Sequence, residues 1–292
     1  MKVCVVMGGA SAEREVSLKT GKAVIEACRN LGFEVNQVVI KNDYKLYLND
    51  FKSCDIVFNA LHGPIGEDGI IQLWFEKNNI AYTGSGPKSS SICMDKNNSK
   101  KIIKGLGYAT PKWDLVGPQT DYTLIKYPCI IKPNSQGSTY GLSIVNNAGE
   151  LSKAVDFARK FDSDVLIEEY IIGREITVGV LGSKALPIVE IKPQNDIYDY
   201  ECKYKPGMSL YYCPAKLNDN ITRKIKIDSE SIFKALGCKS YGRIDYIIDK
   251  NMNYYFLELN TLPGMTSTSL LPIAAKALNI SFNDLVHKIV NE

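Results

Sequence analysis

Acidic side chains face each other in a predicted β-hairpin near the end of the chain. Residues 240–249 and 254–260 both have the composition of strands, and the short turn between them pairs Asp245 with Glu258. Directly opposed like charges destabilise a sheet, so we expect a cation between them. Oxygen donors from Asp245, Glu258 and Asn260 together suit Mg²⁺, an ion that commonly accompanies phosphates. The hairpin therefore predicts that the chain handles a nucleoside triphosphate.

A glycine-rich loop over residues 132–141 lies between two predicted strands. Its glycines allow backbone N–H groups to approach phosphate oxygens, and Lys132 adds a positive charge. The loop matches neither the Walker P-loop nor the G-x-G-x-x-G fingerprint. On composition alone an ordinary hairpin loop is favoured roughly two to one. Together with the acidic hairpin, the phosphate-binding interpretation is favoured instead.

Three other loops carry groups that could contact a ligand. His62 follows a buried strand, where it either satisfies the loop backbone or touches a ligand. Glu13 lies in a charged turn after Gly9, and the sequence leaves open whether it complements a helix dipole or binds a substrate ammonium. Residues 260–270 combine small hydroxyl side chains with Gly264, and such a run can present backbone donors to an oxyanion.

The composition is that of an ordinary soluble globular protein, with 45% hydrophobic and 23% charged residues. A formal net charge of +3 over 292 residues gives no indication of nucleic-acid binding. The basic stretch over residues 96–104 is interpreted as a solvated helix face or an anion site. The eight cysteines are scattered and are expected to be reduced thiols, mostly buried. We find no signal peptide and no membrane span, which favours the cytoplasm.

Two segments of the chain, with different orders of strands and helices, are expected to position these groups. Between residues 2 and 84 strands and helices alternate, which predicts a small parallel sheet whose ligand cleft lies beyond the carboxyl ends of its strands. The expected elements are strands at 3–7, 33–40, 55–61 and 80–83 and helices around 18–31 and 70–77.

A second unit is expected to open near residue 94 with a lysine-rich helix that ends at residue 105. It continues with strands at 128–132, 142–145 and 165–170 and an amphipathic helix at 151–161. Strands then recur at 176–181 and 186–191. Residues 192–214 show no clear period, and long irregular connections of this kind are commonly lids or binding loops.

Nine short motifs are spread over nearly the whole chain. They are S-A-E-R-E-V-S-L at 11–18, A-L-H-G at 60–63, G-E-D-G at 66–69, Y-T-G-S-G at 82–86, M-D-K at 94–96, K-P-x-x-x-G-S at 132–138, D-Y-x-x-K-Y at 199–204, G-R-I-D at 242–245 and E-x-N-T-x-P-G-M-T at 258–266. Together they resemble the D-alanine:D-alanine ligase family of the ATP-grasp superfamily. Their joint occurrence is highly specific, although no single motif would be.

The resemblance implies an α/β fold of the ATP-grasp type. A Rossmann-like parallel-sheet domain would span residues 1–95, a central ATP-grasp subdomain 96–172, and a C-terminal subdomain 173–292 with a lid loop at 193–213. The two α+β subdomains would enclose the nucleotide. A homodimer of the chain is also implied.

The same resemblance assigns roles to matching residues. Lys96 and Lys132 would bind the phosphates of ATP, with Lys203 at the γ-phosphate. Adenine would contact Glu168 and the backbone of Tyr170 and Ile171, and the ribose would contact Glu175. Two Mg²⁺ ions, with Mn²⁺ as a substitute, would be held by Asp245, Glu258 and Asn260. Glu13 would bind the ammonium of the first D-alanine, with His62 nearby, and Tyr204 would join Ser138 and Glu13 when the lid closes. Arg243 and Gly264 would stabilise the oxyanion. Ser269 and Leu270 would border the second D-alanine.

The implied reaction joins two D-alanine molecules through an acyl phosphate. A D-serine-using relative is a close alternative, whereas Tyr204 disfavours a D-lactate ligase because those relatives resemble this chain except for a histidine there. A kinase or nucleotide-binding regulator would leave residues 267–270 unexplained. A nicotinamide-binding protein would need a glycine spacing that the first turn lacks. Tyr140 and Glu169 depart from the family pattern, and Tyr140 raises a question about packing of the phosphate loop.

Overall fold

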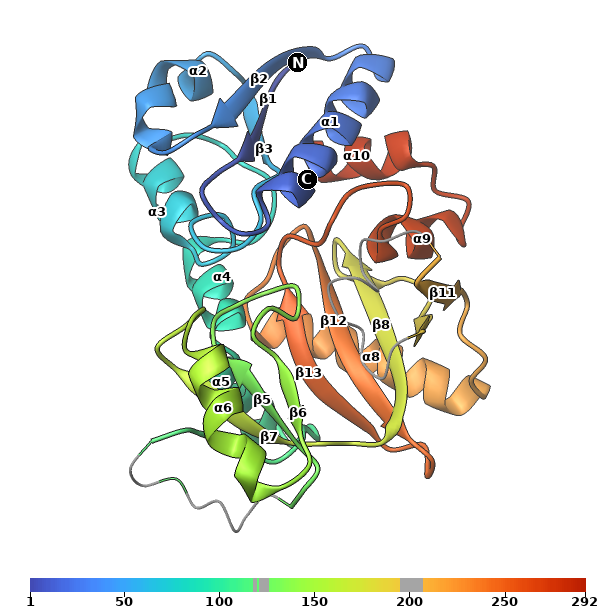
Figure 1. Ribbon diagram of the computed structural model, residues 1–292. Helices are drawn as coiled ribbons and strands as arrows, with labels where there is room; N and C mark the ends of the chain where they lie inside the picture. Colours follow the sequence, from blue (N-terminus) through green and yellow to red (C-terminus); the bar gives the residue numbers. More distant parts are fainter. Residues whose placement is uncertain (118–119, 121–125, 195–206) are drawn as a thin grey trace.

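Three β-sheets with helices packed around them make up the computed structural model (Figure 1). It describes residues 1–117, 120, 126–194 and 207–292. Each sheet takes its strands from one part of the sequence, in the order N-terminal, central and C-terminal.

The N-terminal sheet is parallel, as the alternation of strands and helices predicted. Its order is β2 (Glu34–Ile40), β1 (Lys2–Gly8) and β3 (Ile56–Asn59). The apolar run of β1 is buried on both faces, which is typical of a central parallel strand. The predicted strand at 80–83 was wrong, because Tyr82 forms only an isolated bridge with Val57.

Helices and turns around this sheet follow the sequence pattern. They are α1 (Arg14–Asn30), the 3₁₀ helix η1 (Tyr44–Tyr47), α2 (Leu48–Lys52), α3 (Ile70–Lys77) and α4 (Pro87–Met94). The helix predicted at 70–77 is confirmed by α3. At the carboxyl end of β1, a turn with Gly8 and Gly9 at positive φ leads directly into α1, so Glu13 comes to lie at the start of this helix.

The central sheet is antiparallel in the order β4 (Trp113–Leu115), β7 (Val165–Glu169), β5 (Cys129–Pro133) and β6 (Ser143–Val145). The helices α5 (Lys96–Gly105) and α6 (Ala148–Ala158) belong to the same unit. The apolar face of α6, including Ala154, Val155 and Ala158, is buried against this sheet. The predicted strands and amphipathic helix of this unit are therefore confirmed, apart from small shifts at their ends.

The C-terminal sheet has the order β11 (Ser209–Tyr212), β10 (Val189–Pro193), β8 (Gly173–Leu181), β12 (Tyr241–Asp249) and β13 (Tyr254–Asn260), with β9 (Lys184–Ala185) paired to β8. The helix α8 (Asp219–Ala235) packs against this sheet. The predicted pairing of Asp245 with Glu258 is confirmed, and Arg243 pairs with Asn260, whereas nearer the turn the register differs by one residue, with Tyr246 opposite Phe256. A bulge after Asp245 was not foreseen.

The last two helices return to the start of the chain. Helices α9 (Leu270–Lys276) and α10 (Phe282–Val290) share one hydrophobic core with β1 and α1, and α10 lies beside α1 in Figure 1. Leu285 and Val286 are buried in this core together with Val3 and Val24. The two ends of the chain therefore share one hydrophobic core.

The stretch predicted to lack regular structure is partly a strand. Residues 209–212 form β11, which pairs antiparallel with β10 from Glu190 to Pro193. Part of the segment expected to form a lid loop, residues 193–213, is therefore strand, and residues 195–206 lie outside the described residues. Lys203 and Tyr204 lie outside the described residues.

Cysteine burial matches the expectation from composition. Five of the described cysteines are buried and unbridged, and Cys93 and Cys238 lie with their sulfur atoms 3.6 Å apart. Among the described residues, no helix has the length and apolar character that a bilayer crossing needs.

Candidate active site

Two cavities meet where the three sheets come together. The smaller, of about 180 Å³, is lined by residues from all three units, including Glu13, His62, Ser138, Arg243, Gly264 and Ser269. The larger, of about 480 Å³, lies between the central and C-terminal sheets. Lys96, Gly137 and Glu258 line both cavities, so a group bound in one can reach a group bound in the other.

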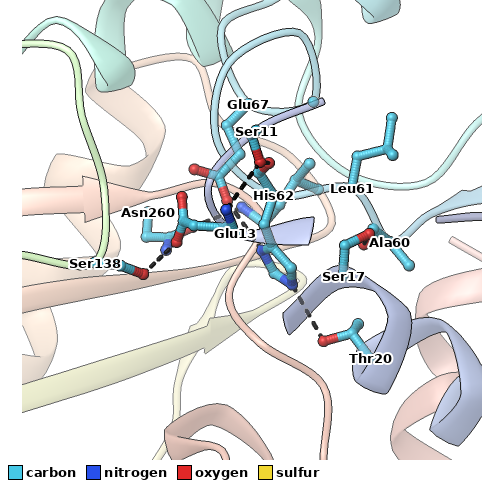
Figure 2. A network of polar contacts seen from close by, with 12 residues as sticks. Ser11, Glu13, Ser17, Thr20, Ala60, Leu61, His62, Glu67, Ser138 and Asn260 are labelled. Carbon is cyan, nitrogen blue, oxygen red and sulfur yellow. Dashed lines mark hydrogen bonds and ion pairs between the residues drawn. The ribbon is translucent and has the colours of Figure 1, made fainter. Parts of the chain in front are cut away.

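Glu13 is a buried carboxylate that lines the smaller cavity and has one oxygen without a hydrogen-bond partner among the described residues. Only 5% of the residue is exposed. Its Oε1 accepts a short hydrogen bond from the Ser138 hydroxyl, as Figure 2 shows, whereas Oε2 has no hydrogen-bond partner among the described residues. A buried acceptor without a partner is costly, which is typical of an atom that awaits a ligand.

Two glycines pack close to this oxygen. A Cβ added at Gly63 would lie 3.0 Å from Glu13 Oε2, and one added at Gly137 would lie 3.1 Å from it. These glycines come from different units of the fold, the first after β3 and the second from the loop after β5. A side chain at either position would therefore press on the Glu13 carboxylate.

His62 is buried beside Glu13 and is held at both ring nitrogens. Its Nδ1 lies 3.1 Å from Oε1 of Glu67, and its Nε2 lies 3.1 Å from the Thr20 hydroxyl (Figure 2). Burial raises the pKa of Glu67, although the hydrogen bond with His62 opposes this change. Sequence reasoning gave Glu67 no role, and its place in the G-E-D-G motif was the available signal.

The glycine-rich loop over residues 132–141 is shaped by residues in the left-handed region of backbone conformation. Ser138 and Thr139 both have positive φ, at 52° and 62°, and this turn brings Ser138 to Glu13. Lys96 holds the loop by a hydrogen bond, in which its Nζ donates to the carbonyl of Gln136 at 2.8 Å. The question about Tyr140 is answered by packing, since its ring stacks on Phe161 with centroids 5.9 Å apart.

The acidic hairpin is neutralised in this structure by the protein's own cations. Arg243 donates to both oxygens of Asp245, at 2.9 and 2.7 Å, and Lys96 Nζ lies 3.2 Å from Glu258. Buried Thr177, on the adjacent strand β8, also donates to Asp245 at 2.6 Å. Sequence reasoning missed Thr177, because its position is set by the pairing of β8 with β12.

The donor set of the hairpin fits Mg²⁺. Among the described residues no three His, Cys, Asp or Glu side chains gather closely enough to hold a metal by themselves. Asp245 and Glu258 are nevertheless directly paired, with Asn260 two residues further on the same strand. Mg²⁺ takes few protein ligands and completes its shell with water and phosphate oxygens, so two carboxylates and one amide are sufficient.

Residues expected at the nucleotide lie along the larger cavity. Lys132, Glu168, Tyr170, Ile171 and Glu175 all line it. Lys132 Nζ donates to Glu168 Oε1 at 2.7 Å. Their arrangement on β5, β7 and β8 follows from the pairing of β5 with β7 and from the course of the chain into β8.

The basic stretch on α5 has a solvated face, as one of the two interpretations expected, and also a buried face. Lys96 and Lys100, one helical turn apart, are buried, whereas Lys101 and Lys104 are exposed. Lys100 lies 2.6 Å from Glu168 Oε2. Sequence reasoning did not assign Lys100 any role.

The loop after β13 completes the smaller cavity. Gly264, Ser269 and Leu270 line it, and the Ser269 hydroxyl accepts from the Thr266 backbone N–H at 3.1 Å. A Cβ at Gly264 would lie 3.1 Å from Ser269 Oγ. All predicted substrate residues that the structure describes are therefore together in one cavity.

Comparison with solved structures defines the class of protein. The chain is similar to the crystal structure of D-alanine–D-alanine ligase from Bacillus anthracis complexed with ATP, with a TM-score of 0.88, 33% identity, and coverage of 100% of this chain and 96% of the other. It is also similar to the VanG D-Ala:D-Ser ligase from Enterococcus faecalis, with a TM-score of 0.84, 28% identity, and coverage of 99% and 98%. The fold is that of the ATP-grasp carboxylate–amine ligases.

Sequence comparison narrows this class to one family. Profiles of the D-ala D-ala ligase C-terminus and N-terminus match residues 117–291 and 46–85. The D-alanine–D-alanine ligase of Syntrophotalea carbinolica is 42% identical over 99% of this chain and 95% of its own length, and that of Aquifex aeolicus is 43% identical over 99% and 100%. The chain belongs to the D-alanine–D-alanine ligase family.

Proposed function

We propose that this enzyme uses ATP to join two D-alanine molecules into D-alanyl-D-alanine for peptidoglycan precursor synthesis. The observation that carries the proposal is the buried Glu13 carboxylate with its unpartnered oxygen. A carboxylate of this kind suits the ammonium of an amino acid, because a charged hydrogen bond would satisfy the free acceptor. The cavity beside it has the size for small substrates.

ATP fits the larger cavity, which has room for a drug-sized ligand. The adenine end is assigned to Glu168 and the backbone of Tyr170 and Ile171, and the ribose to Glu175. Lys132 and Lys96 would then meet the phosphates, with Lys96 at the wall that both cavities share. With adenine and the phosphates bound in this order along the cavity, the γ-phosphate would lie next to the first D-alanine.

The first step must activate a carboxylate, since oxide is too poor a leaving group for direct attack by an amine. Glu13 would hold the ammonium of the first D-alanine so that its carboxylate reaches the shared wall of the cavities. The carboxylate then attacks the γ-phosphate, and an acyl phosphate and ADP form. Lys96 and Lys132 reduce the repulsion between the approaching negative groups.

Asp245, Glu258 and Asn260 would hold Mg²⁺, which supplies charge neutralisation on the phosphate oxygens when bound. Arg243 is paired to Asp245 here, and a bound cation would weaken that pairing. The Arg243 guanidinium would then be available to the oxyanion that forms at the substrate carbonyl. The proposal of two ions, or of Mn²⁺ in their place, comes from the family resemblance.

In the second step the amine of another D-alanine attacks the acyl phosphate, and phosphate leaves. Arg243 and the backbone N–H of Gly264 are proposed to stabilise the tetrahedral oxyanion, an interaction worth about 3 kcal/mol in other acyl-transfer sites. Ser269 and Leu270 would border the second D-alanine. Because water competes for an acyl phosphate, we propose that Lys203 and Tyr204 close over the site when substrates are bound.

A D-serine-using ligase is the second candidate. It is motivated by the structural similarity to VanG, although the identity is lower than to the Bacillus anthracis enzyme. Homodimerisation and a cytoplasmic location are further proposals from the resemblance, as are the domain boundaries at residues 95 and 172.

Phosphate release from ATP tests the proposal directly. Release should require D-alanine, should not respond to L-alanine, and should yield D-alanyl-D-alanine detectable by mass spectrometry. A mixed dipeptide formed preferentially from D-alanine and D-serine would favour the second candidate. ATP turnover that ignores D-amino acids would exclude both.

A further inference from the structure

Lys100 is a buried charge that the reaction described above does not use. It lies on α5, is fully buried, and lines neither cavity. A buried ammonium is unfavourable unless it has charged or hydrogen-bonding partners. Burial accordingly lowers the pKa of Lys100 to about 8, although nearby Glu168 opposes this change.

Its ammonium is fixed by groups from three directions. Lys100 Nζ lies 2.6 Å from Glu168 Oε2 on β7, and it donates to the Thr110 hydroxyl at 2.7 Å. Thr110 in turn donates to the carbonyl of Phe256 on β13 at 2.8 Å. The ring of Trp113 on β4 covers it, with Nζ 5.5 Å from the centroid. These contacts enclose the Lys100 ammonium on several sides.

Glu168 lies between two lysines of different accessibility. Lys132 binds its Oε1 and lines the larger cavity, whereas Lys100 binds its Oε2 from outside the cavity. Burial alone would raise the pKa of Glu168, but the charges of Lys100 and Lys132 outweigh this and lower it. The carboxylate is therefore ionised, and it needs at least one cation beside it.

We propose that Lys100 is a positioning residue of the enzyme, which stays paired with Glu168 so that Lys132 can turn to the ATP phosphates. This inference rests on the proposed function for the identity of the nucleotide. Lys132 can move because it faces the cavity, while Lys100 cannot reach the nucleotide from its enclosed position. Without Lys100, the buried carboxylate would retain Lys132.

The test compares the affinity of ATP with that of adenosine, which lacks phosphates, by calorimetric titration. Lys100→Met should weaken ATP binding about tenfold, as expected for one lost hydrogen bond between charged groups. Adenosine binding depends on the proposed adenine contact of Glu168 but not on Lys132 at the phosphates, so it should weaken much less. The matched control is Lys101→Met, on the exposed side of the same helix, which should leave both affinities unchanged. Equal weakening of ATP and adenosine would overturn the proposal, because it would indicate general damage to the site.

The same substitution is also tested in a Glu168→Gln variant. This comparison tests the role of Glu168 and still gives a result if Lys100→Met alone does not fold. In Glu168→Gln, no buried carboxylate retains Lys132, so adding Lys100→Met should leave the ratio of ATP to adenosine affinity unchanged. A further loss of ATP affinity in the double variant would contradict the proposal. These titrations measure binding and need no turnover. The proposed ligase reaction is tested separately, and it fails if the wild-type protein releases no phosphate with D-alanine.

Discussion

Glu13 and Glu168 are both buried carboxylates, but the protein partners them in opposite ways. Glu168 forms ion pairs with two lysines, whereas Glu13 has one hydroxyl donor and no ion pair among the described residues. Both residues are at most 5% exposed, so burial does not distinguish them. The comparison teaches that a buried charge paired within the protein can hold neighbouring side chains in position. A buried charge without a protein counter-charge can instead bind a charged substrate group.

Removing the charge of Glu13 should have the largest effect. Glu13→Gln keeps the shape and the acceptor for Ser138 but loses the charged bond to ammonium. We expect kcat/KM for D-alanine to fall about a hundredfold, as for loss of a hydrogen bond between charged groups. Steady-state phosphate release measures it, with Glu15→Gln on the exposed face of α1 as the control. An unchanged value would remove Glu13 from the substrate site.

Weakening the acidic hairpin should have the next largest effect. Asp245→Asn removes one of two opposed carboxylates, so the Mg²⁺ concentration for half-maximal activity should rise about tenfold. Metal titration of phosphate release measures this change. Asp249→Asn, at the end of the same strand, is the control. If the two variants respond alike to Mg²⁺, Asp245 is not a ligand.

Filling the space beside Glu13 should have a smaller effect. The Cβ of Gly137→Ala would press on Oε2 from 3.1 Å, and Gly137 does not need a positive φ. We expect the KM for D-alanine to rise about fivefold, since the carboxylate must shift by a few tenths of an ångström. Gly105→Ala, where an added Cβ meets nothing within 4 Å, is the control. A KM that stays the same in both variants would show that the free oxygen does not contact substrate.

The pH dependence of stability should show the smallest effect. Burial raises the pKa of Glu67, so the folded state binds more protons than the unfolded state above the ordinary value of 4.5. Its contribution to stability is therefore present at low pH and is lost as pH rises through the raised pKa. Relative to Glu67→Gln, the wild type should lose free energy of unfolding over that range. Urea denaturation at several pH values measures this, and parallel curves would contradict it.

The hairpin and most strands could be predicted because their signals are local. The short turn between two strand-like runs predicts the hairpin, and the apolar periods define α3 and α6. The pairing of Asp245 with Glu258 also depends on the bulge, since the register beside the turn, with Tyr246 opposite Phe256, would place Leu257 opposite Asp245. The bulge after Asp245 could not be predicted, because it depends on packing in the finished sheet.

Other features depend on contacts between distant segments. Lys96, Lys100, Lys101 and Lys104 have the same side chain, and only the docking of α5 against the sheets decides which are buried. Glu67 and Thr177 acquire their partners in the same way, from His62 and from the pairing of β8 with β12. Strand β11 was missed because its partly exposed position leaves a weak pattern.

The most direct test is a crystal structure of the enzyme with D-alanine and a non-hydrolysable ATP analogue. The D-alanine nitrogen should lie within about 3.2 Å of Glu13 Oε2, a hydrogen-bond distance, and its carboxylate should point toward the γ-phosphate at the wall shared by the two cavities. D-Alanine bound with its nitrogen away from Glu13, or a nucleotide outside the larger cavity, would contradict the account.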